Sequence, residues 1–135
     1  MTIEIKEPET LTEVKISEET KEELKQFSLE EGQVIVHCLF PPNEDDFFIR
    51  VWQTTFLIDR TSSHKSGLLH AEAITLFPDW THVPAQTAKR FTLIFSRLPS
   101  SCKVFDLVEE IPQSGGFFVN GIVRSSTDVY EVKLQ

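Results

Sequence analysis

The sequence has few of the residues on which several common protein classes depend. It contains only two cysteines in 135 residues, Cys38 and Cys102. Two cysteines are too few for a disulfide scaffold, and they lack the CxxC spacing of zinc and redox sites. Because no secretion signal accompanies them, we expect two free thiols.

Long apolar runs are also absent. No stretch approaches the roughly 20 apolar residues that a membrane-spanning helix needs. The first ten residues, MTIEIKEPET, are acidic and lack the apolar centre of a signal peptide. This start predicts a cytoplasmic protein, although a secreted chain whose leader had been removed would begin in the same way.

Basic residues are scarce relative to acids, with 13 Lys and Arg against 21 Asp and Glu and a net charge of −8. Non-specific binding to nucleic acid depends on clustered Lys and Arg that release counterions. Anionic membrane surfaces attract the same basic clusters. We therefore expect neither nucleic acid nor a membrane as a partner.

The charge is unevenly spread and divides the chain into an acidic N-terminal extension, 1–32, and a nearly neutral domain, 33–135. Within the extension, SEETKEELKQFSLEEG has the capping Ser17, early acids and closing Gly32 that are typical of a short helix. Its apolar stripe is thin, consisting of Leu24, Phe27 and Leu29. A marginal helix and an extended edge strand both stay open for the extension.

From Gln33 onward, short β-rich runs alternate with clusters of Pro, Gly and Ser. This pattern is typical of a β-sandwich, and long helical repeats are absent. We therefore predict an all-β domain, an immunoglobulin-like antiparallel β-sandwich of about seven strands. The predicted strands are QVIVHCLF, FFIRVWQTTFLID, LLHAEAITLF, RFTLIFSRL, KVFDLVEEI, GFFVNGIV and DVYEVKL.

Alternating residues in the later strands predict which side chains enter the core. Apolar residues occupy every second position, and polar residues such as Glu131 and Lys133 lie between them on the solvent side. An antiparallel sheet with one solvated face requires this period of two. The predicted inward residues are Phe91, Leu93, Phe95, Phe105, Leu107, Tyr130, Val132 and Leu134.

Two further segments are predicted to form strands inside the sheet. Segment 47–59, FFIRVWQTTFLID, is apolar on both faces, which predicts one central strand, bent or bulged near 53–55, with Trp52 in the core. Segment 115–121, GGFFVNG, has the apolar content that favours an internal strand after a wide turn. Its alternative is an edge strand that pairs with another chain.

The segment LPSSCK around Cys102 lacks the surroundings of a catalytic cysteine. A reactive thiolate needs a nearby His, a metal or a helix N-terminus, and only one lysine is adjacent. Glu109 and Glu110 are neighbours that point to opposite faces of a strand, so they cannot act as a paired acid and base. We predict no catalytic residue and no enzymatic activity.

Polar residues between 59 and 72 form the first candidate binding group. His70 and Glu72 lie two apart and share a strand face, and they meet Asp59 and His64 only if the hairpin folds tightly. A metal needs three or four convergent ligands, whereas a His–x–Glu pair on a strand is ordinarily a solvated polar patch. We therefore predict no metal and no cofactor.

Trp80 and His82 form the second candidate binding group, in the loop FPDWTHVP. Loops on a rigid sheet are where recognition is usually found. Trp80 either caps the end of the sandwich or offers an exposed platform for a ligand or a partner.

Thr54 to Glu110 contains a T-x-x-I-D-turn-L hairpin, then F-T-L-x-F-x-x-L-P, then F-D-L-x-E. The matching positions are Thr55, Ile58, Asp59, Leu68, Leu69, Phe91 to Phe95, Leu98, Pro99, Phe105 to Leu107 and Glu109. This pattern resembles an uncharacterised group of bacterial domains with an immunoglobulin-like fold. The resemblance implies a fold and no activity, since that group has no assigned catalytic residues. The long RTSSHKSG turn and the acidic extension depart from it.

These patterns together favour a non-enzymatic accessory or protein-interaction domain. Its partner would be another protein or a second copy of the chain, bound through a sheet edge or the Trp80 loop. The alternative is a small-ligand or metal-binding protein that uses the hairpin and loop at 59–82.

Overall fold

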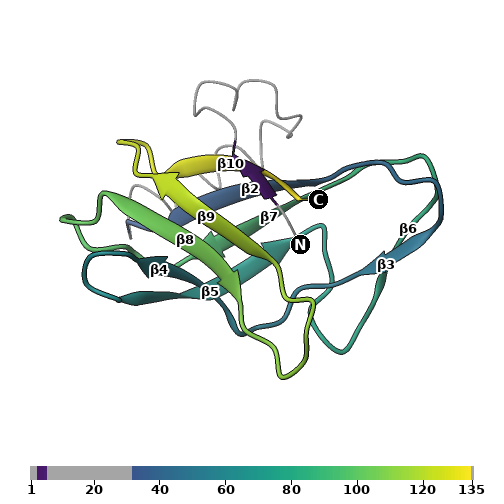
Figure 1. Cartoon of the computed structure of the whole chain (residues 1–135), viewed down its shortest axis with the longest axis horizontal. Helices are drawn as coiled ribbons and strands as arrows, with labels where there is room; N and C mark the ends of the chain where they lie inside the picture. Colours follow the sequence, from purple (N-terminus) through teal and green to yellow (C-terminus); the bar gives the residue numbers. More distant parts are fainter. Residues whose placement is uncertain (1–2, 6–31, 135) are drawn as a thin grey trace.

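The computed structural model describes residues 3–5 and 32–134 (Figure 1). These residues form strands and turns without a helix, which confirms the prediction of an all-β protein. They accordingly include no helix that is long and apolar enough to cross a membrane. Of the extension 1–32, Ile3–Ile5 form an edge strand, and the short helix considered for 17–31 lies outside the described residues.

Ten strands follow one another along the described residues. They are β1 (Ile3–Ile5), β2 (Val34–Phe40), β3 (Phe47–Ile49), β4 (Thr55–Asp59), β5 (Lys65–Glu72), β6 (Thr81–Val83), β7 (Lys89–Phe95), β8 (Val104–Glu109), β9 (Phe118–Val123) and β10 (Val129–Leu134). The last four predicted strands are confirmed: RFTLIFSRL, KVFDLVEEI, GFFVNGIV and DVYEVKL correspond to β7, β8, β9 and β10.

Eight of these strands form one mixed sheet that curls almost into a barrel (Figure 1). Their order is β1-β10-β2-β7-β5-β4-β8-β9, and every neighbouring pair is antiparallel except β10 and β2, which are parallel. The outer strands β1 and β9 come within 8 Å of each other at their Cα atoms, so the sheet nearly closes. The other two strands pair as a separate β3–β6 ribbon, which extends away from the sheet.

The expected immunoglobulin-like sandwich is not confirmed. A sandwich places two sheets face to face, whereas here the hydrogen-bonded order runs through eight strands without a break. A curled sheet of about eight strands also encloses an interior that side chains can fill. Both architectures need the same alternation of inward apolar and outward polar residues, so the alternation alone does not distinguish them.

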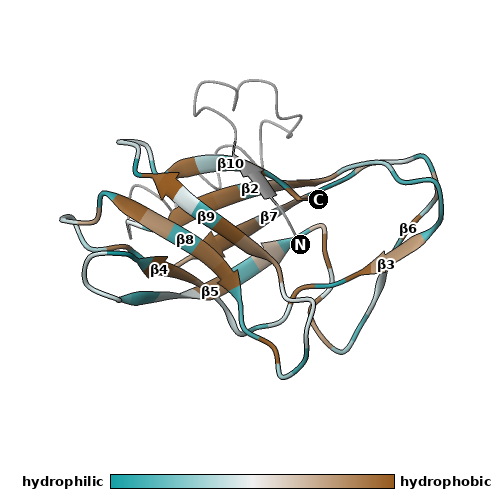
Figure 2. Cartoon of the chain, viewed as in Figure 1, coloured by the Kyte–Doolittle hydropathy of each residue, from teal (hydrophilic) through white to brown (hydrophobic). Residues whose placement is uncertain are grey.

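The interior of the curled sheet is the hydrophobic core, and Figure 2 shows how hydrophobic its strands are. Every residue that the alternation predicted to point inward is buried, including Phe95, Phe105 and Leu107, each 0% exposed. They belong to one cluster that also contains side chains of β2 and β4. Because full burial of such a side chain contributes about 1.5–3 kcal/mol, this cluster is the main stabilising element.

Part of the outer face of β10, β2 and β7 is also buried, contrary to expectation. Glu131 was predicted to face solvent and is only 2% exposed. Its neighbour across the parallel pair is His37, whose Nδ1 lies 2.8 Å from Oγ1 of Thr92. Burial lowers the pKa of His37, and the nearby Glu131 opposes that shift. The apolar Ile35 and Ile94 are buried on this face as well, so alternation predicts the direction of Glu131 and not its burial.

Segment 47–59 forms two strands rather than the one predicted central strand. Strand β3 ends at Ile49 and joins the ribbon, and β4 begins at Thr55 and joins the curled sheet. Between them Val51 bridges to Leu76, and the backbone N–H of Trp52 donates to the Glu109 carboxylate at 3.0 Å. These long-range bonds hold the chain outside both sheets, close to where a bend was predicted.

Strand β9 is the last strand of the sheet order, although an internal strand was favoured for this segment. Gly121 adopts a left-handed φ of 70° within it, and the register with β8 shifts in the same region. Irregular strands of this kind are common at sheet edges. The exposed side chains of Phe118 and Val123 are consistent with the edge position.

Candidate functional site

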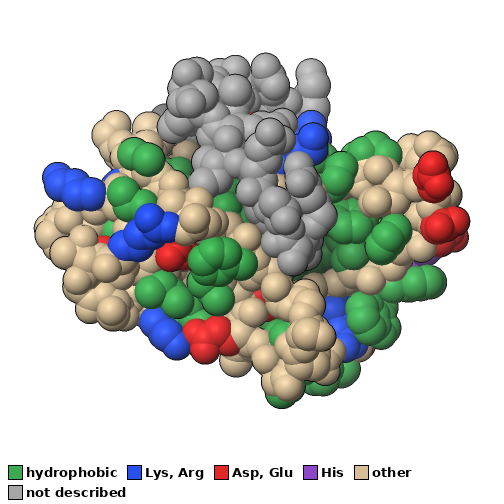
Figure 3. Space-filling view, viewed as in Figure 1, with side chains coloured by type: hydrophobic (Ala, Val, Ile, Leu, Met, Phe, Trp, Pro, Cys, Tyr) green, Lys and Arg blue, Asp and Glu red, His purple; other side chains and the backbone are tan. Residues whose placement is uncertain are grey.

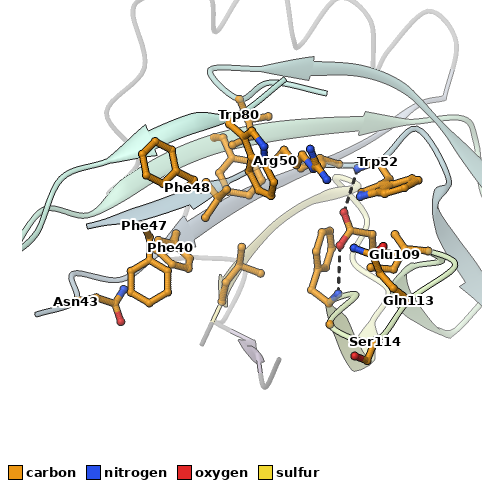
Figure 4. Close-up of a pocket in the computed structure, with 18 of the residues that line it drawn as sticks. Phe40, Asn43, Phe47, Phe48, Arg50, Trp52, Trp80, Glu109, Gln113 and Ser114 are labelled. Carbon is orange, nitrogen blue, oxygen red and sulfur yellow. Dashed lines mark hydrogen bonds between the residues drawn. The ribbon is translucent and has the colours of Figure 1, made fainter. Parts of the chain in front are cut away.

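An aromatic cavity opens where the β3–β6 ribbon leaves the end of the curled sheet (Figure 4). Its volume is about 560 Å³. Small-molecule sites typically have volumes of about 300–1,000 Å³. Seven of the lining residues are aromatic: Phe40, Phe47, Phe48, Trp52, Trp80, Phe91 and Phe117.

The ends of several strands meet at this cavity. Strand β2 ends with Phe40, β8 with Glu109 and β10 with Leu134, and all three residues line the cavity. The following Pro41–Pro42 pair ends β2, because proline has no N–H to donate to a central ladder. The chain then leaves the curled sheet and enters the ribbon.

The loop after β8 forms the opposite wall. Four residues of this loop line the cavity: Ile111, Gln113, Ser114 and Gly115. Gly116 passes so close to β8 that an added Cβ would clash with the carbonyl oxygen of Glu109. Glycine at this position therefore lets the loop approach and brings the backbone of Phe117 to the Glu109 side chain.

Arg50 is stacked among aromatic rings at one side of the cavity. Its guanidinium carbon lies 3.7 Å from the ring centroid of Trp80 and 4.6 Å from that of Phe77. The Phe77 ring in turn stacks on Trp52, with centroids 3.8 Å apart. Nη1 of Arg50 donates to the carbonyl oxygen of Pro78 at 3.0 Å. These contacts hold both tryptophan rings in place.

Glu109 is the buried acid of the cavity. Its side chain accepts the backbone N–H of Trp52 at Oε2 (3.0 Å) and that of Phe117 at Oε1 (3.4 Å), as the dashed lines in Figure 4 show. Burial raises the pKa of Glu109, and the two backbone donors and the charge of Arg50 offset part of that shift. Arg50 and Glu109 are the two charged residues among those that line the cavity.

Exposed aromatic side chains form the rim. Trp80 is 55% exposed, Phe48 59% and Phe47 42%. Figure 3 shows hydrophobic side chains gathered around the ribbon, at the right of the view, with acidic side chains at its outer edge. Contiguous exposed apolar surface on a monomer usually marks an interaction site.

Two of the predicted site residues, Trp80 and His82, lie at this rim. Trp80 lines the cavity, whereas His82 supports it from the ribbon by stacking on Phe48 with ring centroids 5.0 Å apart. Nε2 of His82 lies 2.9 Å from Oδ2 of Asp46. This hydrogen bond, together with one from the backbone N–H of Ala85, lowers the pKa of Asp46.

The remaining predicted site residues lie elsewhere and do not converge. Asp59 is buried and organises the β4–β5 turn, where it accepts the backbone N–H of Thr61 at 3.0 Å and the hydroxyl of Ser62 at 2.6 Å. The Ser62 hydrogen bond is the main cause of the lowered pKa of Asp59. His64 follows in the same turn and is exposed.

His70 and Glu72 pair with each other on the exposed face of β5, with Nε2 and Oε1 2.6 Å apart. They share a strand face, as predicted. Within residues 3–5 and 32–134, no group of three or more His, Cys, Asp or Glu side chains is placed to hold a metal ion.

Both cysteines are free and buried, which confirms the prediction of two free thiols. Burial raises the pKa of each thiol. Cys102 closes the LPSSCK turn by donating its backbone N–H to the carbonyl oxygen of Pro99 at 3.0 Å. The segment is therefore a connection between β7 and β8.

Sequence reasoning missed most of the residues that line the cavity. Trp52 was predicted to lie in the core, but it is half-buried in the cavity wall. Arg50, which also lines the cavity, was not among the predicted site residues. One usable signal was the adjacent pair Phe47 and Phe48, because neighbouring strand residues point to opposite faces and cannot both enter one core. The role of Glu109 had no such signal, since it depends on donors from two distant segments.

No model of a known protein family, no curated protein and no solved structure matches this chain. The geometry of the aromatic cavity is therefore the basis for proposing a function.

Proposed function

We propose that this protein binds a small molecule with an apolar or aromatic body in the aromatic cavity. The observation that carries the proposal is the cavity itself, about 560 Å³ in volume and lined by seven aromatic residues with one buried acid and one arginine. Ligand sites commonly combine predominantly apolar walls with a few placed polar groups, and they commonly lie at the mouths of β-barrels.

The aromatic walls are held in place before a ligand arrives. Phe40 and Phe47 pack edge to face with centroids 5.5 Å apart, and Trp52 and Trp80 are fixed through Phe77 and Arg50. Fewer side chains then lose conformational freedom on binding, which favours affinity. The proposal contains no catalytic step, in keeping with the expectation of a non-enzymatic protein.

A neutral fluorescent probe tests this proposal. N-phenylnaphthylamine becomes strongly fluorescent in an apolar site, so a titration gives its dissociation constant. We expect saturable binding to the wild-type protein with one probe per chain. Phe48→Ala removes an exposed ring at the rim and is expected to weaken binding by roughly three- to tenfold, the value of one aromatic contact.

Phe118→Ala is the matched control, because it removes another exposed phenylalanine that does not line the cavity. We expect it to leave the dissociation constant unchanged. Equal losses in both variants would show non-specific adsorption to exposed rings, and a lack of saturable binding in the wild-type protein would refute a small-molecule site.

The second candidate function is protein interaction or self-association through the edge of the curled sheet. The observation that favours it is the exposure of Phe118 (44%) and Val123 (68%) on the terminal strand β9. The three-residue β1 approaches only part of the six-residue β9, so the rest of the β9 edge can pair with another chain. Sedimentation equilibrium tests self-association: concentration-dependent mass that Val123→Lys abolishes supports it, and a constant monomer mass rejects it.

Two broader predictions stay proposals. A relationship to immunoglobulin-like domains is supported by the alternation of residues in β7 and β8, where the resemblance is concentrated. A cytoplasmic location is supported by the two free thiols, since reducing compartments keep thiols unpaired.

A further inference from the structure

We propose that the ligand of the aromatic cavity is an organic cation, an amine whose ammonium group pairs with Glu109 while its apolar body lies against the aromatic walls. This inference rests on the proposed function and adds the charge and the orientation of the ligand. Four features of the described residues support it.

The first feature is the unused acceptor capacity of Glu109. An ionised carboxylate offers about four lone-pair sites, and the backbone donors of Trp52 and Phe117 engage one on each oxygen. The bond to Phe117 is long, at 3.4 Å. A carboxylate removed from water is unfavourable unless it is paired, so a cationic donor from the ligand stabilises it.

The second feature is that Arg50 does not neutralise Glu109. No ion pair joins the two among the described residues. The guanidinium of Arg50 faces the rings of Trp80 and Phe77 and donates to the carbonyl oxygen of Pro78. The effect of burial on the pKa of Glu109 outweighs the charge of Arg50, so a second cation still gains from approaching the carboxylate.

The third feature is the aromatic surround of the carboxylate. Both residues that bind Glu109 through their backbone, Trp52 and Phe117, also contribute their rings to the lining, and Figure 4 shows Trp52 next to Glu109. The faces of aromatic rings attract cations, most strongly when water is excluded. The stacking of Arg50 on Trp80 at 3.7 Å is an example of this attraction within the cavity wall.

The fourth feature is the charge outside the cavity. Glu44 and Asp45 are exposed and follow directly after Asn43, which lines the cavity. Negative potential near the mouth raises the local concentration of cations and repels anions. An anionic ligand would gain from Arg50 but would face both this potential and Glu109.

Three probes with one apolar body test the charge of the ligand. Phenylbutylamine, phenylbutanol and phenylvalerate carry a positive, a neutral and a negative head group. The two tryptophans of the chain both line the cavity, so tryptophan fluorescence reports occupancy. We expect the amine to bind about tenfold more tightly than the alcohol, because a charged hydrogen bond contributes more free energy than a neutral one. We expect the carboxylate to bind most weakly.

Glu109→Gln tests the assigned partner. We expect this variant to bind the amine and the alcohol with equal affinity, because the charged bond to the ammonium group is lost. The amide nitrogen of glutamine cannot accept a backbone N–H, so one of the two bonds to Trp52 and Phe117 is lost as well, and the readout is the ratio of the two affinities within the variant. Glu110→Gln is the matched control, because Glu110 is the next residue, points outward and pairs with Lys65 at 2.6 Å. It is expected to keep the full preference for the amine.

Each outcome separates the two proposals. If none of the three probes and no neutral fluorescent probe binds, the proposed function fails. If the alcohol binds and the amine binds no better, or if the carboxylate binds best, the cationic inference fails and the small-molecule site stands. The comparison of amine and alcohol on the wild-type protein decides the question even if Glu109→Gln does not fold. An amine preference that survives in a folded Glu109→Gln would overturn the role of Glu109.

Discussion

Glu109 and Glu110 are neighbours in the sequence with opposite surroundings. Glu109 turns inward and is 9% exposed, whereas the side chain of Glu110 is 43% exposed and pairs with Lys65. Strand alternation predicts these opposite directions. It does not predict that the inner carboxylate meets backbone donors of Trp52 and Phe117, because those contacts depend on where two distant segments fold.

Glu109 makes the stability of the folded protein depend on pH. Its pKa is raised above the ordinary value of 4.5, so the folded protein keeps a proton there at pH values where the unfolded chain has lost it. The contribution of Glu109 to the free energy of unfolding therefore falls as the pH rises from the unfolded to the folded pKa, and it stays constant above that window. We expect Glu109→Gln to remove this decline.

Urea denaturation at a series of pH values measures this effect. Glu110→Gln serves again as the control and is expected to keep the decline seen in the wild-type protein. A Glu109→Gln profile with the wild-type slope between pH 4.5 and neutrality would show that Glu109 titrates alike in the folded and unfolded chains.

At the scale of the element, Arg124 joins two turns that are far apart in the sequence. It forms a forked ion pair with Asp128, with nitrogen–oxygen distances of 2.6 and 3.0 Å. Its Nη1 also donates to the carbonyl oxygen of Pro99 at 2.8 Å. The turn between β9 and β10 thereby fixes the LPSSCK turn between β7 and β8.

Loss of this connection is expected to destabilise the fold. Arg124 and Asp128 are each only 18% exposed at the side chain, so solvent screens the contacts only in part. We expect Arg124→Ala to lower the free energy of unfolding by about 2 kcal/mol, typical of hydrogen bonds to a charged group. Arg124→Lys is expected to recover less than half of the loss, because a lysine cannot make the forked contact.

Urea denaturation of the two variants checks this expectation, with probe binding as the companion measurement. Arg124 does not line the aromatic cavity, so the affinity for N-phenylnaphthylamine is expected to stay at the wild-type value. A wild-type free energy of unfolding in Arg124→Ala would contradict the structural role of this residue.

Strands whose apolar and polar residues alternate regularly were predictable from the sequence, whereas the division of segment 47–59 into two strands was not. Phe91, Leu93 and Phe95 alternate with polar residues, and β7 forms where expected. Segment 47–59 is apolar on both faces, which a central strand would equally explain. Its division into β3 and β4 depends on the bridge from Val51 to Leu76 and on the bond to Glu109, and no local pattern records either contact.

At the scale of the whole molecule, the sequence did not predict that the sheet curls until its outer strands nearly meet. Strand β10 lies between β1 and β2 and pairs with β2 in parallel. It thereby places β1 at the end of the sheet that approaches β9. The departure of the β3–β6 ribbon then leaves one end of the curled sheet open. The aromatic cavity follows from these two features, because strand ends and the ribbon supply its walls.

The position of Trp52 and Trp80 provides the most direct test of a small-molecule site. The chain has two tryptophans, so a proton–nitrogen correlation spectrum contains two indole N–H signals, and both report on the cavity. We predict that both signals shift together and saturate as phenylbutylamine is added. Indole signals that stay in place while the probe shifts other residues, or while no residue responds at all, would contradict binding in the aromatic cavity.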